Sequence, residues 1–141
     1  QVVSDNTSHF CPVCHKTLTP PQPLWPHILG RKPDVWIWGG DNIYADVPSF
    51  HAFPVPGVDT MPADPPRLKE LYAKQLQEPG YQQLLHSSAA LVGTWDDHDF
   101  GLNDGDRRYP WRNESQAAFL DFIGEPPGSP RRKPRGGFQS R

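Results

Sequence analysis

Two aspartates, Asp41 and Asp97, each follow a short apolar segment, where a carboxylate needs compensating charge or hydrogen bonds. A pair of metal ions would supply that compensation, because carboxylate, imidazole and phenolate groups suit hard or borderline cations. One bridging carboxylate can hold two ions about 4 Å apart, and His98 would then meet a substrate oxygen or a leaving group. On spacing alone, a second interpretation is equally open: Asp41 caps a turn, and the acids of residues 96–106 form a solvated loop.

Two predicted strands would position these residues. The runs DVWIWGGDN at residues 34–42 and AALVGTW at residues 89–95 are rich in β-branched and aromatic residues, which is typical of short buried strands. The motifs GGDN and WDDHD stand at the ends of these two runs. Ligands of α/β proteins gather beyond the carboxyl ends of strands, so this placement favours a functional site.

Predicted helices alternate with the two strands, an order that indicates an α/β fold. Residues 46–66 hold six prolines and are expected to form an extended surface loop, and the chain after Gly124 is expected to fray. The helices are expected over residues 20–30, over residues 67–86 with an interruption at Pro79-Gly80, and from a cap at Asn113 or Ser115 through Phe122.

The composition of the 141-residue chain predicts one domain with a small core. Proline and glycine number 18 and 12, and five tryptophans carry much of the apolar surface that can be buried. Residues 1–106 hold 6 basic and 13 acidic side chains, whereas residues 107–141 hold 8 basic and 3 acidic ones. No apolar run is long enough to span a membrane, and no signal peptide is visible.

Two longer blocks, GGDNIYAD at residues 39–46 and TWDDHDFGLNDG at residues 94–105, resemble the signature blocks of PhoD-type alkaline phosphatases. These enzymes belong to the calcineurin-like metallophosphoesterase superfamily. The resemblance covers roughly residues 11–141, and the WDDHD block is its specific part. It implies an α/β fold that forms part of the calcineurin-like sandwich, and metal-dependent hydrolysis of phosphate monoesters or diesters by an activated water.

The resemblance also implies a role for five residues of this chain. Asp41 would bridge two metal ions, Tyr44 would be a phenolate ligand to iron, and Asp97 would bind the second metal. His98 would act on the phosphoryl oxygens or on the leaving group, and Cys14 would be a further iron ligand. The implied ions are iron and calcium, with other divalent ions possible.

The resemblance implies, in addition, that the chain is truncated. Later strands of the family's catalytic domain supply further Asp, Asn and His ligands, which this sequence lacks. We therefore expect residues 1–10 to be a tail, residues 11–125 to be the N-terminal part of the PhoD-like domain, and residues 126–141 to be a basic segment leading into a missing C-terminal part.

Other functions stay open beside this one. A catalytically inactive fragment could serve as a metal- or phosphate-binding module, and CPVCH at residues 11–15 has the spacing of haem attachment and two potential zinc ligands. The expected partner is a small phosphate ester, whose charge Arg107, Arg108 or Arg112 could bind. No nucleic acid is expected, since the RRKPR run at residues 131–135 is more typical of a solvated tail. Secretion is suspected from the resemblance only.

Overall fold

The computed structural model describes residues 9–10, 17–18, 22–46 and 61–133. Two parallel strands, β3 (Val35–Gly39) and β4 (Ala90–Thr94), form its central sheet, with Trp36 opposite Leu91 and Trp38 opposite Gly93. A separate antiparallel pair joins β1 (His9–Phe10) to β2 (Thr17–Leu18). Parallel strands need a crossover, and the helical segment between β3 and β4 supplies it, so the predicted α/β class is confirmed.

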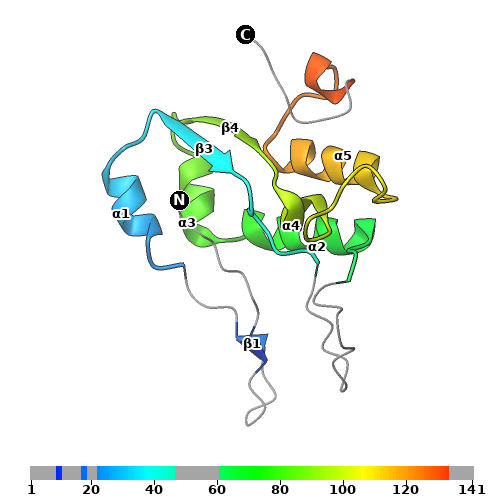
Figure 1. The fold of residues 1–141 in the computed structure, drawn as a ribbon. Coiled ribbons are helices and arrows are strands. Elements are labelled where there is room, and N and C mark those ends of the chain that lie inside the picture. The colour runs from blue at the N-terminus through cyan, green and yellow to red at the C-terminus, as the bar shows by residue number, and fades with distance from the viewer. Residues whose placement is uncertain (1–8, 11–16, 19–21, 47–60, 134–141) are drawn as a thin grey trace.

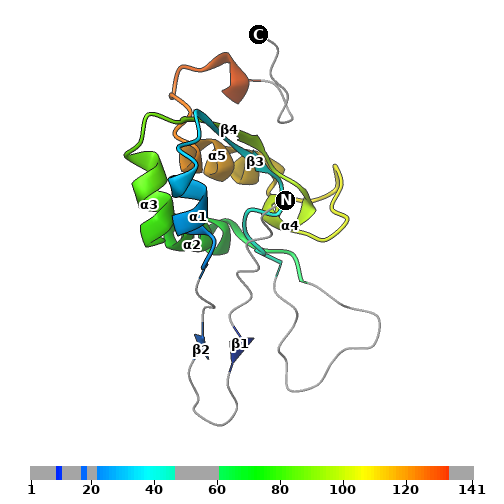
Figure 2. The same cartoon turned by 90° about the vertical axis from the view of Figure 1, so that its left-hand side faces the viewer.

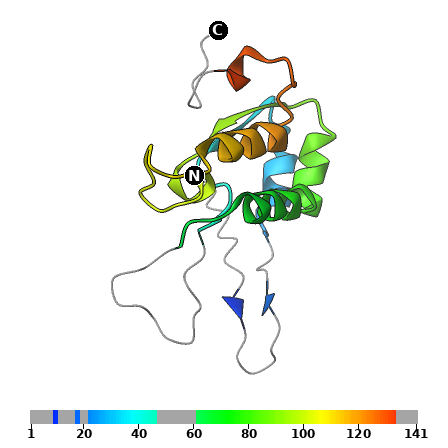
Figure 3. The ribbon, with the colours of Figure 1, turned by 90° about the vertical axis from the view of Figure 1, so that its right-hand side faces the viewer.

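The longer helices lie on one side of the central sheet, and a short 3-10 helix lies apart from them (Figure 1, Figure 2). The helices are α1 (Trp25–Gly30), α2 (Pro65–Leu76), α3 (Pro79–Leu85), α4 (Asp97–Phe100), α5 (Arg112–Phe122) and the short 3-10 helix η1 (Pro130–Arg132). α1 contacts α3, and α2 contacts α5 along its length (Figure 3). No helix of the described residues is both long and apolar enough to cross a membrane.

The helical run expected over residues 67–86, with its interruption at Pro79-Gly80, forms two helices. Asp64 caps α2 by accepting a hydrogen bond from the backbone N–H of Arg67 at 2.9 Å, and prolines occupy the first helical turn. The buried residues of α2 recur at helical spacing: Leu68, Leu71, Tyr72 and Gln75. Pro79 interrupts the run as predicted, because its missing N–H is tolerated only at the start of a new helix.

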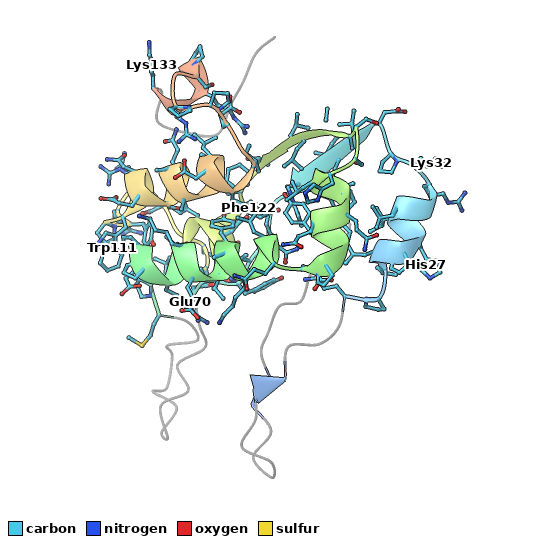
Figure 4. All side chains as sticks on the ribbon, turned by 180° about the vertical axis from the view of Figure 1, so that it is seen from behind. His27, Lys32, Glu70, Trp111, Phe122 and Lys133 are labelled. Carbon is cyan, nitrogen blue, oxygen red and sulfur yellow. The ribbon has the colours of Figure 1, made fainter. Side chains whose placement is uncertain are left out.

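An aromatic cluster forms the core between the sheet and the helices. Trp38 contacts Trp36, Tyr81 and Phe122 with ring centroids 5.3–5.6 Å apart, and its indole N–H donates to the Tyr81 hydroxyl at 3.1 Å. Figure 4 shows Phe122 in the middle of the molecule, whereas Lys32 and Lys133 lie at its periphery. The tryptophans thus contribute much of the core, as the composition predicts.

The prediction that both strands are buried is wrong for one face of the sheet. Trp36 and Trp38 turn toward the helices, but the alternate residues Val35 and Ile37 are 49% and 67% exposed. The sheet has a helical layer on one side only among the described residues, and its other face is apolar and open.

The acidic segment after β4 also departs from the prediction of a loop, since it begins with α4. Asp96 caps this helix in a reciprocal capping box with Asp99, and Gly101 ends it in the left-handed conformation. The predicted cap of α5 is wrong as well. Its cap position is Trp111, which makes no side-chain cap, while Ser115 lies inside the helix and is buried.

The C-terminal segment does not fray through residue 133. Arg131 is buried, donates from Nη2 to the carbonyl of Gly93, and lies 3.5 Å from Glu125 through Nη1. The description of the RRKPR run as a solvated tail is therefore wrong at Arg131, since this residue fastens the segment to β4. Residues 134–141, and most of the loop expected over residues 46–66, lie outside the described residues.

Candidate metal centre

The centre lies where the two parallel strands end. Both strands run in the same direction, so the segment that follows β3 and the helix α4 that follows β4 leave the sheet at the same edge (Figure 1). The backbone N–H of Ala45 donates to the carbonyl of His98 at 3.2 Å and joins the two segments directly. The chemistry-bearing residues of GGDNIYAD and WDDHD are thereby brought together.

Gly40 allows the closest approach of these two segments. Its φ of +102° is strained for any residue with a side chain, and an added Cβ would stand 2.7 Å from the Cβ of Asp96. Asp41 follows with a φ of +51°, which is uncommon for a non-glycine residue. Two consecutive left-handed residues turn the chain sharply after β3 and aim the Asp41 side chain at α4.

Asp41, Asp97 and His98 form the one cluster of at least three His, Cys, Asp or Glu side chains found among the described residues. One potential ligand atom from each lies within 4.8 Å of the other two. The Oδ1 atom of Asp41 is buried and has no hydrogen-bond partner in that part of the chain. Burial raises the pKa of Asp41 above its usual value, although nearby His98 and the Tyr44 hydroxyl oppose this effect.

Asp97 is held by backbone donors on both of its oxygens. Its Oδ1 accepts from the N–H of His98 at 3.0 Å, and its Oδ2 accepts from the N–H of Asp104 at 2.6 Å. These bonds fix the carboxylate at the first turn of α4. Because a carboxylate oxygen has two lone-pair directions, each oxygen can still bind a cation.

His98 is fixed by a buried carboxylate. Its Nδ1 lies 2.7 Å from Oδ1 of Asp46, whose Oδ2 accepts from the backbone N–H of Asn103 at 2.8 Å. Burial by itself lowers the pKa of His98, but the hydrogen bond and charge of Asp46, with the charges of Asp97 and Asp41, outweigh it and raise the pKa. With Nδ1 occupied, Nε2 is the ring nitrogen available for a metal or a substrate.

Tyr44 lies over the same cluster. Its hydroxyl donates to Oδ2 of Asp41 at 3.3 Å, and its ring faces the ring of His98 with centroids 4.3 Å apart. Tyr44 is thus close enough to contribute a phenolate oxygen to an ion held by Asp41. Cys14, the fifth residue expected at the centre, lies outside the described residues.

The residues that the structure describes fit a metal ion by two criteria. Two carboxylates, an imidazole and a phenol are the donors that hard and borderline cations prefer. The buried Oδ1 of Asp41 also needs a partner, since leaving a buried charged oxygen unpaired costs free energy.

Two further residues support the candidate centre, and the sequence analysis assigned neither of them a role. Asp46 orients His98, and nothing in its spacing distinguishes it from other loop acids. Asp99 is fully buried and accepts from the backbone N–H groups of Asn42 at 3.1 Å and Asp96 at 2.6 Å, and also from Nδ2 of Asn42. The spacing of Asp96 and Asp99, an acid three residues after a cap residue, was the signal for a capping box.

Asp99 connects the turn after β3 to the start of α4. Asn42, next to Asp41, donates to both Asp99 and the carbonyl of Thr94, so the turn after β3 is tied to the end of β4. Burial raises the pKa of Asp99 to about 7, against the lowering effect of the backbone N–H groups of Asn42 and Asp96.

Comparison with known proteins adds no neighbour: no family model, no curated protein and no solved structure matches this chain.

Proposed function

We propose that this protein hydrolyses phosphate esters with the help of metal ions bound at Asp41, Asp97 and Tyr44. The observation that carries the proposal is the convergence of Asp41, Asp97 and His98, with potential ligand atoms within 4.8 Å of one another, at the shared end of two parallel strands. The likeness of GGDNIYAD and TWDDHDFGLNDG to the PhoD-type blocks supplies the reaction class.

Asp41, Asp97 and Tyr44 would bind the cation at the centre. Asp41 and Asp97 would hold a cation whose positive charge attracts a phosphoryl group, and the hydroxyl of Tyr44 lies beside them through its hydrogen bond to Asp41. The chemistry that a bound cation supplies at such a site is neutralisation of phosphoryl charge and activation of water.

His98 serves as a proton donor to the departing oxygen. Asp46 accepts a hydrogen bond from Nδ1 and favours the imidazolium form of His98, which raises its pKa. Its Nε2 proton is then available to the leaving group, which is general acid catalysis.

The open face of the sheet supports the finer fold proposal, that the two strands belong to the sandwich of a metallophosphoesterase. Parallel sheets are usually covered on both faces, and the exposed Val35 and Ile37 give this sheet a second apolar face. The described residues supply the α/β unit, and the sandwich is the architecture that the resemblance implies.

The test is hydrolysis of an aryl phosphate monoester and an aryl phosphate diester by the chain, with iron plus calcium, with manganese, or with chelator. Asp41→Asn and His98→Ala are compared with matched exposed controls, Asp34→Asn and His27→Ala. We expect metal-dependent turnover that both site variants abolish and both controls keep.

Metal binding is measured beside turnover by titration calorimetry. One outcome is that the wild type binds metal, that Asp41→Asn does not, and that no condition gives turnover. This outcome would contradict hydrolysis and favour the alternative of a metal-binding module. Turnover unaffected by Asp41→Asn and His98→Ala would exclude the site itself.

A further inference from the structure

A cleft of about 400 Å³ opens beside the candidate metal centre. It lies between the end of β4, the helix α4 and the first turn of α5, and Trp95, Asp97 and Arg112 are among its lining residues. Its volume is in the usual range of small-molecule pockets. Asp97 belongs to both the cleft and the metal centre. A substrate whose phosphoryl group binds at the centre would therefore extend into this cleft.

Two arginines, Arg107 and Arg112, line the cleft together with three aspartates. Nη1 of the half-buried Arg112 donates to the carbonyls of Arg107 at 2.9 Å and Tyr109 at 3.4 Å, which are neutral acceptors. Arg107 also lines the cleft and is exposed. Across the described part of the chain, neither arginine forms an ion pair, although the charge of Arg107 helps Arg108 to lower the pKa of Asp106.

The acidic residues of the cleft have partners of their own. Asp106 is engaged by Arg108, whose Nη2 and Nε lie 2.9 Å and 3.0 Å from its carboxylate. Asp96 accepts the N–H of Asp97 at 2.9 Å as the cap of α4. Asp97 would be neutralised by the cation that the proposed function requires.

The remaining lining includes two half-buried aromatic side chains, Trp95 and Phe100. Each is held in place from behind by another ring, Trp95 by Phe119 at 5.4 Å and Phe100 by Tyr109 at 5.1 Å between centroids. Fixed aromatic walls favour a flat apolar ligand, since such rings stack at little entropic cost.

We propose that this cleft binds the alcohol portion of the phosphate ester and prefers a planar group that carries a second negative charge. The aromatic walls would contact the ring, and Arg107 and Arg112 would bind the anion, because guanidinium groups match carboxylate and phosphate geometry. This inference rests on the proposed function for the identity of the substrate, but the binding preference can be measured without turnover.

The first experiment compares the binding of two probes, 4-hydroxybenzoate and its methyl ester, by titration calorimetry. The wild-type chain should bind the carboxylate about fivefold more tightly than the neutral ester, the factor expected of one partly exposed ion pair. Arg107→Gln should reduce this preference, and it should not disturb folding, because the exposed Arg107 side chain forms no hydrogen bond or ion pair with the described residues. Arg31→Gln, an exposed arginine outside the cleft, is the matched control and should keep the preference.

Arg112 is tested by a pair of variants, since its guanidinium also holds the backbone at Arg107 and Tyr109. Arg112→Gln should lose the preference for the carboxylate, whereas Arg112→Lys should keep most of it, because the charge remains. Equal binding of both probes by the wild type would overturn the proposal. The proposal would also be overturned if both Arg107→Gln and Arg112→Gln kept the preference for the carboxylate.

A second experiment separates this inference from the proposed function by comparing turnover of 4-carboxyphenyl phosphate and phenyl phosphate. We expect Arg107→Gln to lower kcat/KM about fivefold more for the carboxylated ester than for phenyl phosphate. Turnover with no such difference would overturn the cleft proposal and keep the proposed function. A lack of turnover together with the carboxylate preference would remove the proposed function and leave the cleft as an anion-binding site.

Discussion

At the scale of single residues, a buried carboxylate controls the chemistry of the imidazole at the centre. Asp46 is 2% exposed, and its two oxygens hold Nδ1 of His98 and the backbone N–H of Asn103. Buried carboxylates that contact histidines set both the tautomer and the basicity of the ring, so Asp46 should matter although it touches no substrate.

The variant Asp46→Asn tests this positioning role. The amide keeps the shape but removes the negative charge, so the pKa of His98 should fall and the imidazolium form should be lost at lower pH. We expect kcat for aryl phosphate hydrolysis to drop about 10- to 100-fold. The alkaline fall of the pH profile should move to lower pH, whereas Asp34→Asn should change neither quantity. An unchanged pH profile would contradict the role.

Asp99 provides a second prediction, about stability and pH. Its pKa in the folded chain, about 7, lies above the usual value of 3.8. The folded chain therefore binds this proton more tightly than the unfolded chain does. The stabilisation from this proton is complete below about pH 4 and is lost as pH rises toward 7. The free energy of unfolding, measured with urea in the presence of chelator, should therefore decline over this pH range in the wild type. It should not decline in Asp99→Asn.

The same variant also removes an acceptor. Asp99 accepts bonds on both oxygens, and an amide can accept on only one of them. Asp99→Asn should therefore lower the free energy of unfolding by about 1–3 kcal/mol at pH 4. Ser88→Ala, an exposed polar substitution away from the centre, should stay within about 0.5 kcal/mol.

At the scale of elements, the turn after β3 decides whether the two halves of the centre meet. Gly40 places its Cα so near Asp96 that a methyl group would displace α4 or the turn itself. Gly40→Ala should weaken metal binding at least tenfold, because Asp41 would move away from Asp97 and His98. Gly30, where an added Cβ has nothing within 4 Å, is the control. Titration calorimetry would measure the manganese affinity of Gly40→Ala and of Gly30→Ala. Unchanged affinity in Gly40→Ala would contradict this role of the turn.

The sequence was informative about elements and less so about their details. The apolar runs and the Pro79-Gly80 break located the strands and helices, since periodicity and proline act locally. The proximity of Asp41 and Asp97 could be expected because parallel strands end at one edge. The short helix α4 was missed because acidic residues usually indicate loops, and its stability depends on a reciprocal cap between Asp96 and Asp99.

Other features required the tertiary structure. Asp46 pairs with a histidine 52 positions away, and Arg131 reaches a carbonyl 38 positions away, so no local pattern reports either contact. The open face of the sheet was missed for the same reason. The continuous apolar run of residues 35–38 predicts two apolar faces, and only the arrangement of the helices shows which one is covered.

At the scale of the whole molecule, stability should come from one side of the sheet. Trp38 is 4% exposed amid an aromatic cluster, so Trp38→Ala should cost about 3–5 kcal/mol in the free energy of unfolding. Its neighbour Ile37 is 67% exposed on the open face, so Ile37→Ala should cost less than about 1 kcal/mol. Urea unfolding of both variants measures the difference. Similar losses would mean that another layer covers Ile37 in solution, and that the molecule has a second core on the outer face of its sheet.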